Sequence, residues 1–414
     1  MQLAVALPAA AAVSPPPAAA QTTAVRQQQQ QQGMRMLNIS SISMAISSGS
    51  EGMLAALPAH SLTRLDLQGH EGPVDGAAVS AALARLRNLQ QLHIAGESWS
   101  DPARCLTGVA QLTRLTLLEL DGDWTGDGKL MLDLSRLTQL HKFSHRWKQL
   151  DAIFPPQLQQ LTLDDLLTPG QFEALMPLQQ LLRLEFVVCT EAPELLLRLT
   201  QLPALQHISL TYDFINPAAA AVTWAQLPQL CELSIDGDLE PCSQQQWQAT
   251  LDGVAASTHL TKLQLPVNLP VFDGQGDVDV AWCEKLTGLI NLRKFCLKSG
   301  FYSASHLVRG DALALSALTG LTRLVLEGAR QGVGSLAATA IAGSCMQLHH
   351  LELRDCNLGS MASLANVRHL TQLTELRLEG NSGLTQQGLM LLTGLKRLQL
   401  LGVDTNAEVT DEVV

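Results

Sequence analysis

A recurring spacing of leucines constrains the fold of this chain more than any single residue does. The pattern is Leu, two variable residues, Leu, one variable residue and Leu, with Ile, Phe or His replacing a leucine in some copies. It occurs fourteen times, and the steps between copies average about 26 residues, within the range of repeat architectures. The copies begin at Leu62, Leu89, Leu115, Leu140, Leu158, Leu181, Leu205, Leu230, Leu260, Leu292, Leu321, Leu348, Leu373 and Leu395.

Each copy predicts a short β-strand that is buried on one side. Alternate residues of a strand face opposite ways, so the last two leucines of a copy point to the same side. One such strand cannot bury its own apolar side, but stacked copies can cover one another. The copies therefore predict a parallel sheet along one face of a repeat stack, with helices or irregular segments along the other.

The pattern resembles the leucine-rich-repeat family, and several copies extend it upstream, as in LTGLTRLVL (Leu318 to Leu326). The resemblance implies an α/β solenoid, or horseshoe, with the parallel sheet on the concave face and helices or irregular segments on the convex face. In this family an Asn or Cys three residues after the last leucine satisfies backbone groups at the turn. A Gly one place earlier is more common here. The Asn or Cys is matched only at Asn268, Asn381, Cys189 and Cys356.

The beginning of the chain differs in composition from the repeats. It has an Ala- and Pro-rich start, a glutamine run at 27–32 and a Ser-rich stretch, and its first acidic residue is Glu51. We therefore divide the chain into a low-complexity, disordered tail at 1–52 and a leucine-rich-repeat domain of about fourteen repeats at 53–414. For the tail, a transit peptide and a signal peptide remain open alternatives. Since the tail holds no repeat leucine, we expect removal of residues 1–50 to leave folding unchanged.

Charge and cysteine content narrow the classes of partner. The net charge is -11, whereas sequence-independent binding to nucleic acid or to an anionic membrane needs an excess of Lys and Arg. The sequence has no apolar run of the length that a membrane-spanning helix needs. Its eight cysteines are scattered, without the close pairs of disulfide-rich secreted domains. These features predict no nucleic-acid partner, no membrane partner and a reducing compartment such as the cytoplasm.

Two stretches resemble metal sites, and both lack part of the pattern. The segment 121–132 begins like a calcium loop, but Leu132 stands where the bidentate carboxylate belongs. The residue types of a zinc site occur at Cys345, His349, His350 and Cys356, but the two adjacent histidines point apart on a predicted strand. Neither a Walker-type phosphate loop nor a Gly-x-Ser-x-Gly elbow occurs. We expect no metal, no cofactor, no small-molecule substrate and no catalysis.

The solvent-facing positions of the predicted strands carry charge in stripes. The position before the first inward leucine holds seven Lys or Arg residues against two Glu residues, and the next two solvent-facing positions hold more Asp and Glu than Lys and Arg. One interpretation is that neighbouring columns neutralise one another, as Arg64 with Asp66 or Arg183 with Glu185. The other is that the stripes select a partner segment of complementary polarity.

We expect the best single binding position in the irregular fourth copy. There the next copy begins only eighteen residues later, and His145 takes an inward position. Function concentrates where a repeat departs from its rule, and Arg146 and Trp147 are residue types enriched in interface hot spots. The competing interpretation is that Trp147 only fills a packing gap. The full set of candidate protein-binding residues is Arg146, Trp147, Tyr212, Arg64, Arg183, Glu185, Arg323 and Glu352.

The resemblance implies a non-enzymatic interaction scaffold or adaptor that binds another protein on its concave face. Family members with bare repeat arrays often serve in ciliary axonemes, as ligase subunits or in immune receptors. The stretch before Leu62 is too short for an F-box helix bundle or a nucleotide-binding domain. We favour a cytoplasmic assembly subunit, with the cytoskeleton or the ciliary axoneme as its setting. The alternatives are a soluble organellar protein with a cleaved N-terminal peptide and a substrate-recognition subunit of a ligase.

The assigned register makes a prediction of its own. Leu233 is an inward leucine of the copy that begins at Leu230. Leu233→Asp places an unpaired charge in the predicted core, and we expect it to cost on the order of 4 kcal/mol or more and to disrupt folding. Thermal unfolding followed by circular dichroism measures this loss. A cooperative transition at the wild-type temperature would contradict the register.

Overall fold

A computed structural model describes most of the repeat region. The chain divides into two compact units, Met1–Ser40 and Ser41–Val414, and the second holds all the helices and strands discussed below. The residues that the structure describes are 39–47, 49–69, 74–96, 99, 101–122, 130–146, 150–166, 169–188, 194–212, 223–236, 244–266, 282–298, 311–328, 330–358 and 361–404.

In these residues, fifteen strands form one parallel sheet whose order is the order of the repeats along the chain. Parallel pairing of neighbouring strands requires a crossover connection between them. The strands are β1 (Ser41–Ile46), β2 (Arg64–Gly69), β3 (Gln91–Ala95), β4 (Leu117–Asp121), β6 (Lys142–His145), β8 (Gln160–Leu166), β9 (Arg183–Val188), β10 (His207–Tyr212), β11 (Glu232–Asp236), β12 (Lys262–Pro266), β13 (Lys294–Lys298), β14 (Arg323–Glu327), β15 (His350–Arg354), β16 (Glu375–Arg377) and β17 (Leu400–Gly402).

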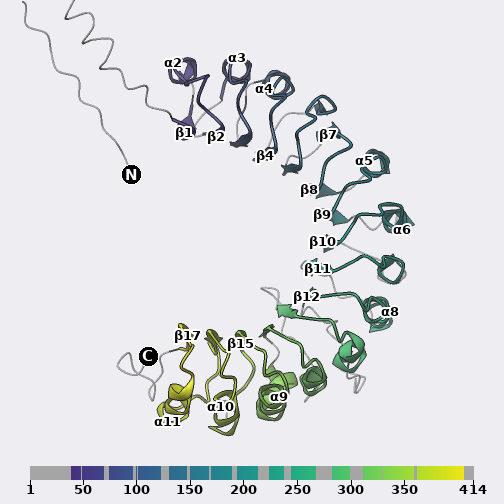
Figure 1. The fold of residues 1–414 in the computed structure, drawn as a ribbon, viewed down its shortest axis with the longest axis vertical. Coiled ribbons are helices and arrows are strands. Elements are labelled where there is room, and N and C mark those ends of the chain that lie inside the picture. The colour runs from purple at the N-terminus through teal and green to yellow at the C-terminus, as the bar shows by residue number, and fades with distance from the viewer. Residues whose placement is uncertain are drawn as a thin grey trace, which may run out of the picture. The chain divides into compact units, whose positions relative to one another are not determined.

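Short helices occupy the side of the stack opposite the sheet (Figure 1). Sheet and helices together make an α/β leucine-rich-repeat solenoid, as the leucine spacing predicts. The α-helices are α2 (Glu51–Ala55), α3 (Gly76–Leu83), α4 (Pro102–Val109), α5 (Pro169–Leu175), α6 (Glu194–Arg198), α8 (Gln244–Ala256), α9 (Arg330–Ser344), α10 (Met361–Val367) and α11 (Gln386–Met390). The 3-10 helices are η1 (Leu199–Gln201), η2 (Trp282–Gly288), η3 (Asp311–Ala317) and η4 (Leu391–Gly394).

The core is the layer of inward side chains between the sheet and the helices. In the sheet register Leu65 lies beside Leu92, and Leu92 lies beside Leu118. All three are buried, so the leucines of successive repeats cover one another. Leu233 holds the same position in β11, is buried and lies beside Leu263, which agrees with the predicted register. Burying one leucine fully contributes about 1.5–3 kcal/mol, and every repeat buries several.

The sheet begins before the predicted start of the repeat domain at residue 53. β1 pairs in parallel with β2, and Ile42 and Met44 take its inward positions and pack against the core. Ile46, at the end of β1, is fully buried. Ile39, Ile42 and Met44 keep the spacing of the repeat without its leucines. Residues from Ser41 onward therefore belong to the compact repeat unit, and not to the tail.

The predicted third and fourth copies have strands in the layer that helices occupy elsewhere. β5 (Leu130–Asp133) neighbours α4, β7 (Leu150–Ile153) neighbours α5, and the two strands pair in parallel as a separate sheet. A strand advances about 3.3 Å per residue against about 1.5 Å for a helix, so fewer residues cross the same face. A strand in this layer is compatible with the short spacing of the fourth copy, although the third copy has such a strand at an ordinary spacing. His145 points inward as predicted, is 1% exposed and lies beside the Phe143 ring.

The buried asparagine at the turn after β16 joins the turns of two repeats. The Oδ1 atom of Asn381 accepts the backbone N–H groups of Cys356 and Leu358, each at 3.1 Å. Its Nδ2 atom donates to two backbone carbonyls, each at 2.7 Å. This is the role that the resemblance implies, because buried turn groups need hydrogen-bond partners. Two other matches to the family pattern, Asn268 and Cys189, lie outside the described residues.

Glycines at the ends of β2 to β4 allow their turns to stack closely. Gly96 and Gly122 have φ values of 155° and 131°, which disfavour other residues. A Cβ atom on Gly122 would lie 2.0 Å from the carbonyl oxygen of Gly96. The glycines after the strands therefore serve both the turn conformation and the contact between repeats.

The position of β1 changes what an N-terminal deletion removes. A chain that begins at Ile39 keeps β1, and we expect its melting temperature to equal that of the full chain. A chain that begins at Gly49 loses Ile42, Met44 and Ile46 and exposes β2, so we expect its melting temperature to fall by at least about 2 °C. Calorimetry of the full chain and the two truncated chains measures these melting temperatures. Equal melting temperatures for the two truncated chains would show that β1 does not contribute to thermal stability.

Candidate functional site

The solvent-facing side chains of the sheet, which we call the strand face, form continuous columns across the strands. The register of the sheet sets equivalent positions side by side. In the first column Arg183 of β9 lies beside His207 of β10, followed by Glu232 of β11 and Lys262 of β12. The charge stripes predicted along the chain are therefore rows of neighbouring side chains in space.

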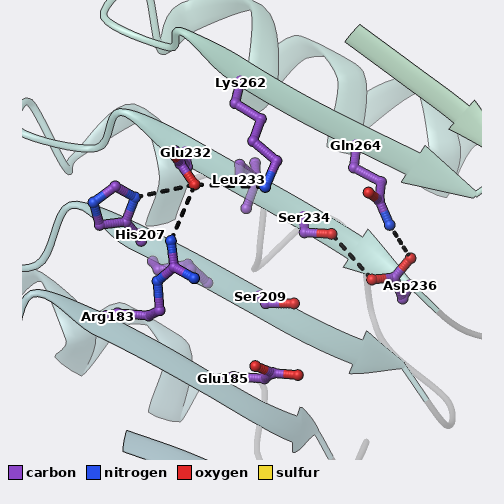
Figure 2. Close-up of a pocket in the computed structure, with 11 residues that line it drawn as sticks. Arg183, Glu185, His207, Ser209, Glu232, Leu233, Ser234, Asp236, Lys262 and Gln264 are labelled. Carbon is purple, nitrogen blue, oxygen red and sulfur yellow. Dashed lines mark hydrogen bonds and ion pairs between the residues drawn. The ribbon is translucent and has the colours of Figure 1, made fainter. Parts of the chain in front are cut away.

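Strands β9 to β12 carry a hollow of about 230 Å³ in the strand face (Figure 2). Its floor includes Ser209 and Ser234, whose small side chains leave space between larger neighbours. The first column lies along one side of the floor, and Asp236 stands at the other side (Figure 2). The lining residues are Arg183, Glu185, His207, Ile208, Ser209, Glu232, Leu233, Ser234, Asp236, Lys262 and Gln264.

Glu232 is the centre of the first column in the hollow. Its Oε2 atom lies 3.4 Å from Nη2 of Arg183, 3.2 Å from Nδ1 of His207 and 3.5 Å from Nζ of Lys262. Burial raises the pKa of the Glu232 carboxyl, and the charges of His207, Lys262 and Arg183 together lower that pKa, leaving it below its ordinary value. The carboxylate is therefore charged at neutral pH and compensated by its neighbours.

These contacts correct the expected neutralisation along single strands. Arg183 reaches across two strands to Glu232 and forms no ion pair with Glu185 among the described contacts. Asp66 likewise contacts His93 on the next strand at 3.0 Å, and no described ion pair joins it to Arg64. The charges on this part of the strand face are compensated across the strands.

Two carboxylates at the hollow have no cationic partner in the described part of the chain. Asp236 accepts hydrogen bonds from Oγ of Ser234 at 3.0 Å and from Nε2 of Gln264 at 2.6 Å. Glu185 is exposed and accepts a long hydrogen bond of 3.5 Å from Thr162. All these donors are neutral, and no described Lys, Arg or His forms an ion pair with either carboxylate. The hollow thus has a first column in which cationic groups contact Glu232, and two carboxylates without a described cationic partner, Glu185 in the row of the two serines and Asp236 in the next row.

A second charged cluster lies on β15 and β16 and continues into the following turn. Nδ1 of His350 is 2.6 Å from Glu375, and its Nε2 is 3.4 Å from Glu352. Both ring nitrogens thus face carboxylates. Arg354 contacts Glu352 at 3.0 Å and Glu379 at 3.1 Å. Opposite charges compensate one another throughout this cluster, which links adjacent repeats.

The predicted hot-spot arginine lies at the end of β6 between two aspartates. Nη1 of Arg146 is 3.6 Å from Asp121, and its Nε is 3.6 Å from Asp164. Its side chain remains 60% exposed, so the guanidinium is oriented but accessible. Trp147 lies outside the described residues, and of Tyr212 only the backbone, at the end of β10, is described.

The structure brings together two of the predicted binding residues, Arg183 and Glu185, at the hollow. Arg64 on β2 and Arg323 on β14 are exposed on the strand face, far apart along the sheet. Glu352 is 7% exposed and held in the second cluster, so its carboxylate is not a free surface charge.

Nine of the eleven residues that line the hollow were absent from the predicted binding set. Among them are Glu232, Asp236, Ser209 and Ser234, and each of these four faces solvent at a regular strand position. The sequence did contain a sign of the hollow, because the two serines occupy the central column in consecutive copies. Small residues between charged columns mark a depression, but its depth depends on how the surrounding side chains turn.

The suggested zinc ligands are not brought together. Cys345 and Cys356 are buried, and Cys356 Sγ donates to the carbonyl of Leu326 at 3.2 Å. No group of three or more His, Cys, Asp or Glu in the described part of the chain is arranged to hold a metal ion. Most of the calcium-like segment, at 123–129, lies outside that part. None of the six cysteines that the structure describes is in a disulfide bond, and burial raises the pKa of Cys105 to about 12.

Comparison with known proteins finds similarity only at the level of structure. No family model matches the chain, and no curated protein matches it. An internalin of Listeria monocytogenes is 17% identical, with a TM-score of 0.44, over 78% of this chain and 83% of that one. A leucine-rich-repeat protein of Leptospira interrogans is 16% identical, with a TM-score of 0.35, over 88% of this chain and 100% of that one. The fold assignment therefore rests on the repeat geometry described above.

Across the described ranges, no helix has both the length and the apolar character that crossing a bilayer requires.

The contacts of Glu232 predict a small, pH-dependent contribution to stability. The folded pKa of this carboxyl lies below the unfolded value of about 4.3, so its contribution is complete above that value and is lost as the pH falls through the folded pKa. We expect Glu232→Gln to cost less than about 1 kcal/mol at neutral pH, because the cluster is partly exposed.

Urea unfolding from neutral pH to about pH 3 tests this expectation. Glu284→Gln is the matched control, since Glu284 is exposed on η2 and makes no described ion pair. A stability difference for Glu232→Gln that stays constant on acidification would contradict the assigned role of the charge.

Proposed function

We propose that this protein is a non-enzymatic interaction scaffold that binds another protein on its strand face. The observation that carries this proposal is the continuous sheet, which presents solvent-facing polar and charged side chains from successive repeats on a rigid backbone. Repeat arrays of this kind offer extended surfaces, because each repeat adds one row of side chains to the next. The long charged columns give such a surface the means to select a partner by charge pattern.

The side chains in the hollow also support a binding role over a hydrolytic one. Ser209, His207 and Glu232 have the residue types of a nucleophilic triad. Catalysis by such a triad needs a hydrogen bond between the hydroxyl and the imidazole. The ring of His207 is turned toward Glu232 and away from Ser209 (Figure 2), and no described hydrogen bond joins the ring to the hydroxyl. The arrangement therefore favours recognition of charge.

Within this general role, we propose an assembly subunit, with the cytoskeleton or the ciliary axoneme as its setting. The resemblance to bare leucine-rich-repeat arrays motivates this choice. A ligase substrate-recognition subunit and an organellar protein with a cleaved N-terminal peptide are the alternatives. Identification of the mature N-terminus by mass spectrometry separates the organellar alternative from the other two, because a cleaved peptide leaves a new N-terminus downstream.

A paired substitution in the irregular copy tests the interaction role. Affinity capture with mass spectrometry first identifies the main partner. We then expect Arg146→Ala with Trp147→Ala to weaken binding of that partner at least about tenfold, near 1.4 kcal/mol, because these residue types dominate interface energies. The melting temperature should stay within about 2 °C of wild type, because the Arg146 side chain is mostly exposed.

Arg136→Ala is the control, since Arg136 is exposed just before the start of the fourth copy at Leu140 and lies outside the strand face. It should leave binding unchanged. Loss of binding in step with loss of folding would instead identify Trp147 as a packing residue, and unchanged binding by the double variant would remove this position from the site.

A further inference from the structure

The hollow on β9 to β12 has a charge imbalance that its own residues do not resolve. In the first column the cationic groups of Arg183 and Lys262 already share the carboxylate of Glu232. Glu185, in the row of the two serines, and Asp236, in the next row, accept hydrogen bonds only from neutral groups among the described residues. The hollow therefore lacks a positive charge near Glu185 and Asp236.

The size of the hollow limits what can supply that charge. Its volume of about 230 Å³ is below the range of about 300–1,000 Å³ typical of pockets for small molecules. The two serine side chains of its floor leave room for one inserted side chain. A metal ion is a poorer fit, because no group of three or more potential ligands occurs in the described part of the chain. The cationic group of one inserted side chain fits this volume and does not need three ligands.

Strand geometry places the two carboxylates suitably for such a side chain. Glu185 lies on β9 and Asp236 on β11, and one strand separates them. Neighbouring strands are about 4.8 Å apart, so the two backbones stand roughly 10 Å apart across the sheet. Between them Ser209 and Ser234 offer hydroxyl groups at the floor (Figure 2). A guanidinium has five donors in a planar fork and can contact carboxylate and hydroxyl groups at once.

We propose that the hollow is the specificity position of the strand face and receives one basic side chain, preferably arginine, from the bound protein. This inference rests on the proposed function and adds the chemistry of the partner. The charge of the inserted group lies between Glu185 and Asp236, above the serine floor. Arg183 and Lys262 repel a second basic group from the other side of the hollow, so the partner's cation has one position.

Selection from a displayed library of random twelve-residue peptides tests the inference on the full chain. We expect peptides that bind the wild-type protein to be enriched in Arg or Lys at one position. The double variant Glu185→Gln with Asp236→Asn should bind those peptides at least tenfold more weakly. Glu284→Gln removes an exposed carboxylate on η2, outside the strand face, and should bind them as the wild type does.

A charge reversal gives a second, independent readout. Glu185 is exposed, so Glu185→Lys should fold normally, and circular dichroism checks this. Selection on that variant should no longer enrich basic residues. Enriched peptides without a basic position, or peptides that bind the double variant as well as the wild type, overturn the inference. A library without any enriched peptide overturns it as well, whereas the proposed function is judged separately by the paired Arg146 and Trp147 substitution with the captured partner.

Discussion

Everything in this structure depends on the covering of one repeat's inward side chains by those of the next. A single strand with two inward leucines has no interior of its own, so its burial requires neighbours on both sides. Leu92 shows this directly, since it lies between Leu65 and Leu118 and is completely buried. Because these leucines must stack, the strands are held in one register. The same register then aligns the solvent-facing positions into columns.

Stacking also imposes a requirement on the polar groups between repeats. The buried turn groups of one repeat are satisfied by side chains of the next, as Asn381 does for the turn after β15. A threonine after the first leucine of a copy has a related role. Its hydroxyl donates to a backbone carbonyl of the preceding repeat at Thr116, Thr261, Thr322 and Thr374. The sequence Leu-Thr-x-Leu therefore couples an apolar contact to a hydrogen bond between the same two repeats.

Charge compensation on the strand face follows from the spacing of the sheet. Side chains on adjacent strands stand about 4.8 Å apart, whereas neighbours on the same face of one strand stand about 6.8 Å apart. The shorter separation favours contacts across strands, as between His207 and Glu232. A long arginine can still reach along its own strand, as Arg377 does to Glu375 at 2.6 Å. The pattern of free and compensated charge is thus a property of the assembled sheet.

Sequence by itself determined the solenoid, the inward positions and the columns, because all three follow from a residue spacing that strand geometry converts directly into sidedness. His145 was placed inward on this basis, and it is buried. The start of the sheet at β1 escaped the leucine pattern, because Ile42 and Met44 supply apolar volume without leucine. Only the tertiary structure decided which charges are compensated. Arg183 turns to Glu232 on β11, and Glu185 of its own strand forms no ion pair with any described residue. The contact of Arg183 with Glu232 joins residues 49 positions apart in the sequence, and a repeat spacing does not determine such side-chain contacts.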